Sequence, residues 1–145
     1  MDEFQEQIVE LQSDAEWREA FPILQSLRSE LTENDLLQRR DKFLSDKFTL
    51  FGLRLNQELV AVAGVDLYPH LSRGTDCWVH DLVTKETVRS KGYGVKLMRH
   101  IEKWAKKHGC SRICVHTRLG REDAQRFYET KLGYPRSAVV YYQDV

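Results

Sequence analysis

A run of six residues, Arg89-Ser90-Lys91-Gly92-Tyr93-Gly94, is the part of this sequence best suited to bind a ligand. Its two glycines carry no Cβ and accept positive φ angles, so the backbone there can approach a bound group closely. An apolar segment, residues 78–83, precedes the run, and a helix-patterned segment follows it. The first turn of a helix presents amides without intrahelical partners and the positive end of the helix dipole. The run therefore predicts a loop that binds phosphate.

Two common phosphate-binding motifs are excluded by the residues around this loop. A dinucleotide-binding fingerprint needs G-x-G-x-x-G, and Leu97 stands where the third glycine would be. The nucleotide-binding pattern G-x-x-x-x-G-K-[ST] occurs nowhere in the chain, which disfavours a nucleotide-binding protein. What remains is R-x-x-G-x-G between a strand and a basic helix, a pattern that is moderately specific by itself.

A second group of chemically capable residues follows the pattern A-x-x-F-Y-E-x-x-L-G-Y over residues 124–134. Phe127 and Tyr128 fit the inner face of an amphipathic helix, and core packing is sufficient to explain Phe127. Tyr128 differs, because a buried phenol needs a hydrogen-bond partner and can donate a proton to a leaving group.

Hydrophobic periodicity predicts the strands and helices that position these motifs, in the order β-α-α-β-β-β-α-β-α-β. A capping box at Ser13–Glu16 starts the first of two N-terminal helices, which Pro22 is expected to kink or split. Asn56-Gln57 predicts a tight hairpin turn, and residues 68–76 are expected to form a loop. The expected strands are residues 7–11, 48–55, 58–67, 78–84, 111–117 and 138–142. The later helices are expected over residues 95–108 and 121–132.

Length and composition are typical of one globular domain, residues 1–145, with 41% hydrophobic and 30% charged residues. The chain opens on Met1-Asp2-Glu3, without the basic and apolar segments of a signal peptide. No apolar run approaches the ~20 residues that span a bilayer. We therefore expect a cytoplasmic protein without membrane association.

Cysteine and histidine usage gives no sign of a disulfide framework or a metal site. Cys77, Cys110 and Cys114 lack C-x-x-C spacing and are expected to be reduced thiols. His108 and His116 lie near two of them, but the spacing fits no tetrahedral ligand pattern, so no metal is expected.

Charge is balanced over the whole chain but unevenly spread. Residues 1–50 carry 12 acids and 6 bases, and residues 51–145 carry 10 acids and 16 bases. An anionic ligand at the glycine loop fits this asymmetry, although a solvated, lysine-rich helix face would produce the same counts. Nucleic acid is not an expected partner, because the chain is not basic overall and contains no known nucleic-acid-binding motif.

Taken together, the two motifs resemble those of the general N-acetyltransferase (GNAT) superfamily. R-x-x-G-x-G precedes the long helix, A-x-x-F-Y-E-x-x-L-G-Y follows the next strand, and the element order agrees over nearly the whole chain. The resemblance implies an α/β (α+β) GNAT fold. Its sheet would be mixed and mostly antiparallel, with about six to seven strands and a V-shaped splay between the fourth and fifth. The implied co-substrate is acetyl-CoA.

The resemblance also assigns residues to CoA. The pyrophosphate would bind at the loop, whose residues are Arg89, Ser90, Lys91, Gly92, Tyr93 and Gly94. Main-chain groups of Val83 and Thr84 would pair with the pantetheine amides, and a strand N–H near Leu82 or Val83 would polarise the thioester carbonyl. Arg121 stands where many relatives carry an asparagine that touches CoA; it either reaches a CoA phosphate or is merely solvated.

Proton transfer is implied for three side chains. Tyr128 matches the tyrosine that protonates the departing CoA thiolate in many members. The base that deprotonates the acceptor amine is either His80, Asp81 or water alone. Successive strand residues face opposite sides, so only one of His80 and Asp81 is expected to face the site. From the family, the expected acceptor-lining residues are Tyr68, Pro69, His70, Trp78 and residues 22–34.

The sequence thus predicts an N-acetyltransferase that moves an acetyl group from acetyl-CoA to a primary amine by direct attack in a ternary complex. A non-catalytic, CoA-binding regulatory module of the same fold is the alternative, and Tyr128 with the His80–Asp81 pair favours the enzyme. The acceptor would be a small-molecule or peptide amine that no motif identifies. The oligomeric state stays open, with a homodimer as one expectation.

Overall fold

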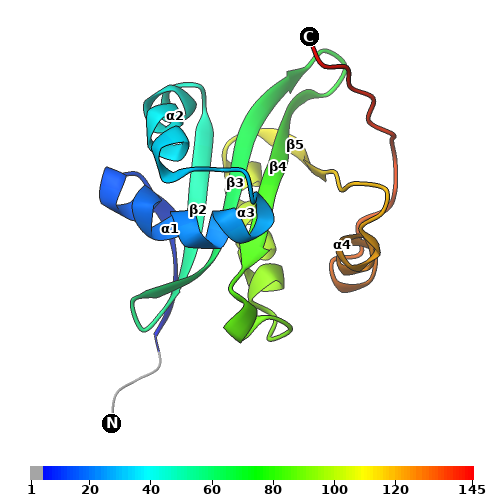
Figure 1. Cartoon of the computed structure of the whole chain (residues 1–145). Helices are drawn as coiled ribbons and strands as arrows, with labels where there is room; N and C mark the ends of the chain where they lie inside the picture. The colour runs from blue at the N-terminus through cyan, green and yellow to red at the C-terminus, as the bar shows by residue number, and fades with distance from the viewer. Residues whose placement is uncertain (1–4) are drawn as a thin grey trace. The chain divides into compact units, whose positions relative to one another are not determined.

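Five strands form a single sheet in the order β1-β2-β3-β4-β5 in this computed structural model, which describes residues 5–145 (Figure 1). The strands are β1 (Glu6–Leu11), β2 (Phe48–Leu55), β3 (Glu58–His70), β4 (Gly74–Thr84) and β5 (Cys110–Val115). β1 to β4 pair antiparallel, as predicted. The described residues hold five strands, so the prediction of six to seven is wrong.

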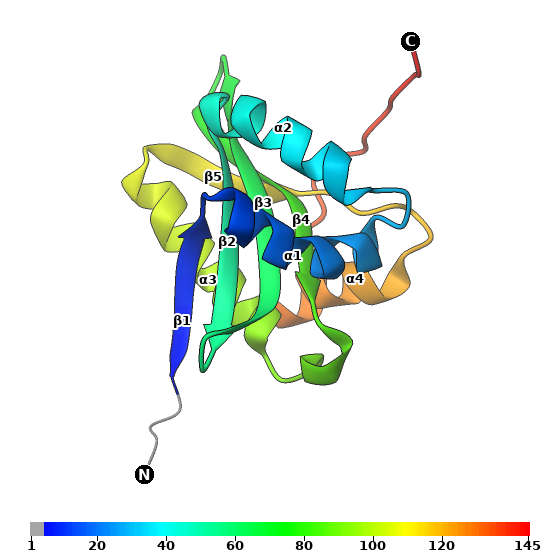
Figure 2. The ribbon, with the colours of Figure 1, turned by 60° about the vertical axis from the view of Figure 1, so that its left-hand side comes forward.

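The chain divides into two compact units, one reaching to Cys114 and the other running from Val115 to Val145. The first unit contains α1 (Asp14–Leu27), α2 (Glu33–Ser45), the short 3-10 helix η1 (Glu86–Val88) and α3 (Tyr93–Lys107). Figure 2 shows α1 and α2 in front of the sheet and α3 behind it. With both faces covered, every residue of β3 from Leu59 to Val65 is buried.

Helix α1 begins at the predicted capping box. Glu16 N donates to Ser13 Oγ at 3.1 Å, and Ser13 N donates to Glu16 Oε1 at 3.0 Å. The predicted split at Pro22 is wrong, because α1 runs through it without interruption. Proline removes one backbone hydrogen bond, whereas the buried face of α1, from Trp17 to Leu24, anchors the residues on both sides of it.

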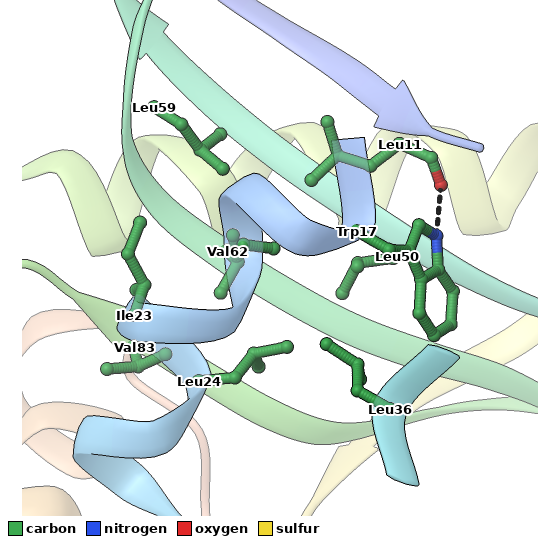
Figure 3. Close-up of a cluster of buried hydrophobic side chains, with 10 residues drawn as sticks. Leu11, Trp17, Ile23, Leu24, Leu36, Leu50, Leu59, Val62 and Val83 are labelled. Carbon is green, nitrogen blue, oxygen red and sulfur yellow. Dashed lines mark hydrogen bonds between the residues drawn. The ribbon is translucent and has the colours of Figure 1, made fainter. Parts of the chain in front are cut away.

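The core between these two helices and the sheet is a cluster of buried apolar side chains (Figure 3). Trp17 is its largest member, and its indole Nε1 donates to the Leu11 carbonyl at 2.8 Å. This bond satisfies the buried indole N–H and ties α1 to the end of β1. Val62 and Val83, which are paired across β3 and β4, also belong to this cluster and so face α1 and α2.

The hairpin of β3 and β4 is longer than predicted. Residues 68–76 were expected to form a loop, but Tyr68 pairs with Asp76 and Pro69 with Thr75. Gly74, with a φ of 95°, supplies the left-handed conformation that lets the chain turn after His70. The antiparallel ladder therefore continues almost to the tip of the hairpin.

The second unit contains α4 (Glu122–Arg126), followed by one π-helical turn, η2 (Phe127–Lys131). Leu132 N donates to Phe127 O, and Gly133, with a φ of 74°, ends the helix as predicted. The predicted strand over residues 138–142 is wrong, since residues 134–145 carry no regular structure. Its β-branched and aromatic residues favour a strand, but a strand also needs a partner, and Tyr141 and Tyr142 are exposed. Over residues 5–145, no helix combines the length and apolarity that a membrane crossing requires.

Candidate active site

The glycine loop leads directly into α3. Ser90 and Gly92 adopt left-handed conformations, with φ values of 64° and 87°, and Gly92 is the N-cap residue of the helix. A Cβ added at Gly92 would meet no heavy atom within 4 Å. Glycine is therefore favoured here by its backbone conformation, which other residues adopt only at a cost, rather than by lack of space.

The backbone N–H groups at the N-terminus of α3 lack the capping side chains that α1 and α2 have. Those two helices have side-chain caps at Ser13 and Thr32 and acidic residues in their first turns, whereas α3 has neither. Its first hydrogen bond runs from Lys96 N to Gly92 O at 3.1 Å, so the amides of Tyr93, Gly94 and Val95 precede it. This arrangement suits an anion such as the CoA pyrophosphate.

Basic side chains flank these amides. Lys91 is exposed beside Gly92. Arg89 Nε donates to the Thr84 carbonyl at 3.2 Å, and its Nη1 lies 3.7 Å from Glu86 Oε1. The Arg89 guanidinium thus lies at the end of β4, between the strand and the loop.

A β-bulge interrupts β4 at His80. Gly64 pairs with Asp81 and Val65 pairs with Val79, which leaves His80 as the extra residue. His80 Nε2 lies 2.9 Å from Asp66 Oδ1, and Asp66 lies on the same face of β3 as Gly64 and Val62. His80 therefore points to the face that α1 and α2 cover.

Asp81 points to the same face. Its Oδ1 accepts a hydrogen bond from Arg28 Nε at 2.8 Å, and Arg28 Nη2 also donates to the His80 carbonyl at 3.0 Å. The expectation that only one of His80 and Asp81 faces this side is wrong, because the bulge breaks the strict alternation on which it depended.

The strand register also assigns directions to the main-chain groups that follow the bulge. Lys85 N donates to Val60 O at 2.8 Å, so the N–H of Lys85 faces β3. Main-chain groups alternate in direction along a strand, so those of Val83 also face β3, and those of Leu82 and Thr84 face the opposite edge. Of the two predicted sources of an N–H for the thioester, Leu82 is the one directed outward, and Val83 is engaged by β3.

β5 lies beside β4 in the sheet. Ser111 Oγ donates to the Thr75 carbonyl at 3.3 Å, and Arg112 Nε lies 3.1 Å from Asp76 Oδ1. Both contacts lie at the beginning of β4, whereas Leu82 and Thr84 lie at its other end. The splay of these two strands stays a prediction.

A groove of about 270 Å³ lies between α1, α2 and the sheet, and Asp81 lines it. We call it the α1–α2 groove. Four residues of the predicted acceptor segment 22–34 line it: Leu24, Arg28, Glu30 and Leu31. The other predicted acceptor residues, Tyr68, Pro69, His70 and Trp78, are not among its lining residues.

Sequence reasoning missed Asp66 and Gly64, and it missed the contact of Arg28 with Asp81. A Cβ at Gly64 would lie 2.6 Å from Phe48 Cζ and 3.3 Å from Asp81 Oδ2, so glycine makes room for both side chains. The isolated glycine inside an apolar strand was a usable signal of such a close approach. The roles of Asp66 and Arg28 depend on cross-strand and helix–strand contacts that no local motif encodes.

Tyr128 and Arg121 belong to the second unit. The Tyr128 ring is nearly parallel to that of Tyr134, with centroids 6.5 Å apart, and Phe127 meets it edge-on at 5.3 Å. Tyr134 N donates to the Tyr128 carbonyl at 2.8 Å, just after the π-helical turn. Arg121 is the exposed N-cap residue of α4. Their assigned roles toward CoA stay predictions.

Three free thiols occur in the chain, and none is suited to act as a nucleophile. Burial raises the pKa of Cys77 to about 12, and burial also raises the pKa values of Cys110 and Cys114. A thiol with a raised pKa holds little thiolate at neutral pH. In the described part of the chain, no three His, Cys, Asp or Glu side chains are grouped to hold a metal ion.

Comparisons with known proteins agree with this geometry. A model of the acetyltransferase (GNAT) family matches residues 12–134. The chain is 34% identical over 137 residues to the uncharacterized N-acetyltransferase YhdJ of Bacillus subtilis (strain 168), covering 94% of this chain and 96% of that protein. It is 28% identical over 117 residues to aminoglycoside N(6')-acetyltransferase type 1 of Serratia marcescens, covering 77% and 80%.

Solved structures share the fold at lower identity. Aminoglycoside N-acetyltransferase AAC(6')-Iy in complex with CoA superposes with a TM-score of 0.86 at 13% identity, covering 99% of this chain and 97% of that one. Glucosamine-6-phosphate N-acetyltransferase from Arabidopsis thaliana gives 0.78 at 19% identity, covering 97% and 98%. Because the family model spans residues 12–134 and a relative at 34% identity covers nearly all of both chains, this protein belongs to the acetyltransferase (GNAT) family.

Proposed function

We propose that this acetyltransferase moves an acetyl group from acetyl-CoA to a primary amine by direct attack in a ternary complex. The observation that carries the proposal is the uncapped N-terminus of α3, placed directly after a strand that is bulged at His80. An anion site and a deformed strand edge then lie one loop apart, which suits a ligand with a phosphate end and a reactive acyl end.

Binding of acetyl-CoA would use the loop first. The amides of Tyr93, Gly94 and Val95, with the positive helix end, would hold the pyrophosphate, and Lys91 and Arg89 would add charge. The outward main-chain groups of Thr84 would pair with the pantetheine amides. For that, Arg89 would have to share or release the Thr84 carbonyl to which it donates here.

Polarisation of the thioester would come from the N–H of Leu82. As the amine attacks, negative charge develops on the carbonyl oxygen, and a fixed donor stabilises that charge more than it stabilises the ground state. A single donor of this kind contributes on the order of 3 kcal/mol to the barrier in other enzymes. Positioning both substrates would supply much of the rest.

His80 is the better candidate for the base. Asp81 Oδ1 is engaged by the Arg28 guanidinium, which holds that carboxylate in an ion pair. When His80 Nε2–H donates to Asp66, its Nδ1 keeps a free lone pair for an ammonium proton, directly or through one water. Asp66 would then fix the tautomer and the orientation of the imidazole ring.

The proposed reaction balances as follows. The acceptor ammonium gives one proton to His80, the amine nitrogen forms a bond to the acyl carbon, and the C–S bond breaks. Tyr128 gives its proton to the departing thiolate. The nitrogen loses its second proton as the C–S bond breaks, and this proton restores the Tyr128 phenol, directly or through water. The products are an N-acetylated amine and CoA, and His80 releases its proton to solvent. No protein acyl intermediate is required, which agrees with the raised pKa values of the cysteines. Aminoglycosides are one acceptor class to test, because one relative bears that name.

The experiment combines binding with turnover. Calorimetry with CoA and with ATP measures the ligand, and thiol release from acetyl-CoA in the presence of a panel of primary amines measures transfer. We expect CoA to bind and ATP not to bind, with thiol release that depends on the amine. Binding of CoA without amine-dependent release from any amine would favour the non-catalytic module, and binding of ATP alone would reject both.

A further inference from the structure

The α1–α2 groove has an apolar interior with an aromatic wall. Phe48 lies in the middle of this wall, with ring centroids 5.3 Å from Phe43 and 6.1 Å from Trp17. Leu24 and Leu31 line the groove from α1 and from the segment that follows it. Side chains of this kind offer no hydrogen bonds, so hydroxyl or amino groups buried against them would lose their hydration without compensation.

Charged side chains also line the groove. Glu30, Asp35 and Asp81 are acidic, and Arg28 and Arg39 are basic. Since Arg28 is already paired with Asp81, the remaining balance is two carboxylates against one guanidinium. The groove thus favours a single cationic group attached to an apolar body.

The groove also reaches the proposed reacting atoms. Asp81 lines it, the His80 side chain lies on the same face of β4, and Leu82 is the next residue in the chain. An amine held near Asp81 would therefore lie beside both the proposed base and the proposed carbonyl donor. The apolar body of the same molecule would extend along Phe48 toward Phe43.

We infer that the acceptor is a compact primary amine with an alkyl or aryl body, rather than a polyhydroxylated polycation. The inference rests on the proposed transfer to an amine and adds the chemical class of the acceptor. Its basis is the aromatic wall, the small acidic excess and a volume of about 270 Å³. Burial of the body supplies affinity, and the carboxylates favour the protonated amine on entry.

A homologous series of amines tests the apolar contribution at constant charge. Thiol release is measured with n-propylamine, n-butylamine, n-pentylamine, n-hexylamine, 2-phenylethylamine and sisomicin. We expect kcat/KM to rise about fourfold per methylene while the groove fills, the value for full burial of one CH₂ group. 2-Phenylethylamine is expected to match the longer alkylamines, and sisomicin to fall below all of them.

Two carboxylates that line the groove, the exposed Glu30 and the half-buried Asp35, test the charge contribution. Asp35→Asn and Glu30→Gln are each expected to raise KM for n-hexylamine about two- to fivefold, with kcat little changed, as suits partly solvated charge pairs. Asp46→Asn is the matched control, since Asp46 also carries an exposed carboxylate at the end of α2 but does not line the groove. Its KM should equal that of the wild type.

Each contrary result has a distinct meaning. A flat or falling alkylamine series, or a higher kcat/KM for sisomicin, would overturn the acceptor class while leaving amine transfer intact. Equal KM values for Asp35→Asn, Glu30→Gln and Asp46→Asn would show that the groove is not the site that binds the charged amine. If CoA binds but no amine in the panel supports thiol release, the proposed function itself fails.

Discussion

At the scale of single residues, His80 and Asp81 show how neighbours on one strand acquire different chemistry. The bulge directs both side chains to one face, yet His80 meets a carboxylate and Asp81 meets a guanidinium. When His80 Nε2–H donates to Asp66, the Nδ1 of the ring can take up a proton, whereas the ion pair with Arg28 occupies an oxygen of Asp81. His80 is therefore suited to exchange protons and Asp81 to hold an ion pair.

Replacement of Asp66 tests whether it positions His80. Without the carboxylate, His80 loses the contact that fixes its tautomer and its orientation. The plateau of kcat against pH should therefore fall in Asp66→Asn, by about tenfold if it resembles other second-layer contacts. Asp66→Glu should restore part of the plateau. The pH profile of thiol release gives the answer, and an unchanged profile would remove Asp66 from the mechanism.

Tyr128→Phe tests the proposed proton donor. Loss of a general acid typically costs about 10²- to 10⁴-fold in rate, and the affinity for CoA should change little because the ring remains. Steady-state thiol release and calorimetry measure the two quantities. Tyr142→Phe, at an exposed position of the same unit, is the matched control. Equal rates for the two variants at every pH would exclude Tyr128 as the acid.

At the scale of elements, the N-termini of the helices are of two kinds, capped and uncapped. α1 and α2 begin with side-chain caps that satisfy their own amides, whereas α3 begins with glycine. A capped helix start gains about 1 kcal/mol of stability, and a start without a cap keeps its amides for a ligand. Local stability is thus lower where CoA is proposed to bind.

Gly92→Ala tests whether the backbone conformation at the start of α3 is needed for CoA binding. The φ of 87° is unfavourable for alanine, and the open space around Gly92 removes steric overlap as a second cause. We expect a loss of about 1 kcal/mol in the free energy of unfolding and weaker CoA binding by calorimetry. Gly120→Ala is the control, since that glycine is equally open and has no positive φ. Equal CoA affinity in both variants would contradict a role for the loop conformation.

The capping box of α1 makes stability depend on acid. Hydrogen bonds from the Ser13 backbone lower the pKa of Glu16 below its usual 4.5. A carboxylate with a lowered folded-state pKa stabilises the fold above its unfolded pKa, and that contribution disappears as the pH falls through the folded-state value. Glu16→Gln removes this charge from the first turn of α1, so it should lower the free energy of unfolding at pH 7 by up to about 1 kcal/mol. Denaturant melts from pH 7 to pH 3 should show this difference shrinking below about pH 4.5; a constant difference would contradict it.

At the scale of the whole molecule, local patterns predicted most elements and the antiparallel hairpins, but not the details of how the strands pair. Residues 48–55 form β2 as predicted, because the strand and its turn at Asn56-Gln57 are encoded by neighbours in sequence. The bulge at His80 and the extension of the hairpin to Pro69 depend on a second strand. Residues 138–142 have the composition of a strand and no strand structure, because composition does not supply a partner.

In the candidate site, too, local motifs could be recognised from the sequence and long-range contacts could not. The glycine loop, the helix after it and the His80–Asp81 pair were recognised from residue types at fixed spacing. The contacts that give these residues their environments come from segments up to 53 positions away, as between Arg28 and Asp81. Such contacts arise only once the sheet and α1 are packed together.

The alkylation rate of Cys77 measures how readily the first unit unfolds. Cys77 is fully buried, and its pKa of about 12 leaves almost no thiolate at pH 8. Alkylation of Cys77 by iodoacetamide should therefore proceed at the rate allowed by unfolding, and Cys110 and Cys114, which are partly exposed, should react first. Peptide mass spectrometry over time measures the order. Early labelling of Cys77 would show that β4 opens without global unfolding.

The additional residue at position 80 makes the fourth strand change sides partway along its length. Before it, odd-numbered side chains such as Val79 point toward α3; after it, odd-numbered side chains such as Val83 point toward α1 and α2. Deletion of this one residue would reverse the faces of half of the strand, so that either the ion-paired Asp76 or the groove-lining Asp81 would move to the opposite face of the sheet. Insertions and deletions in this strand should accordingly be tolerated far less than substitutions.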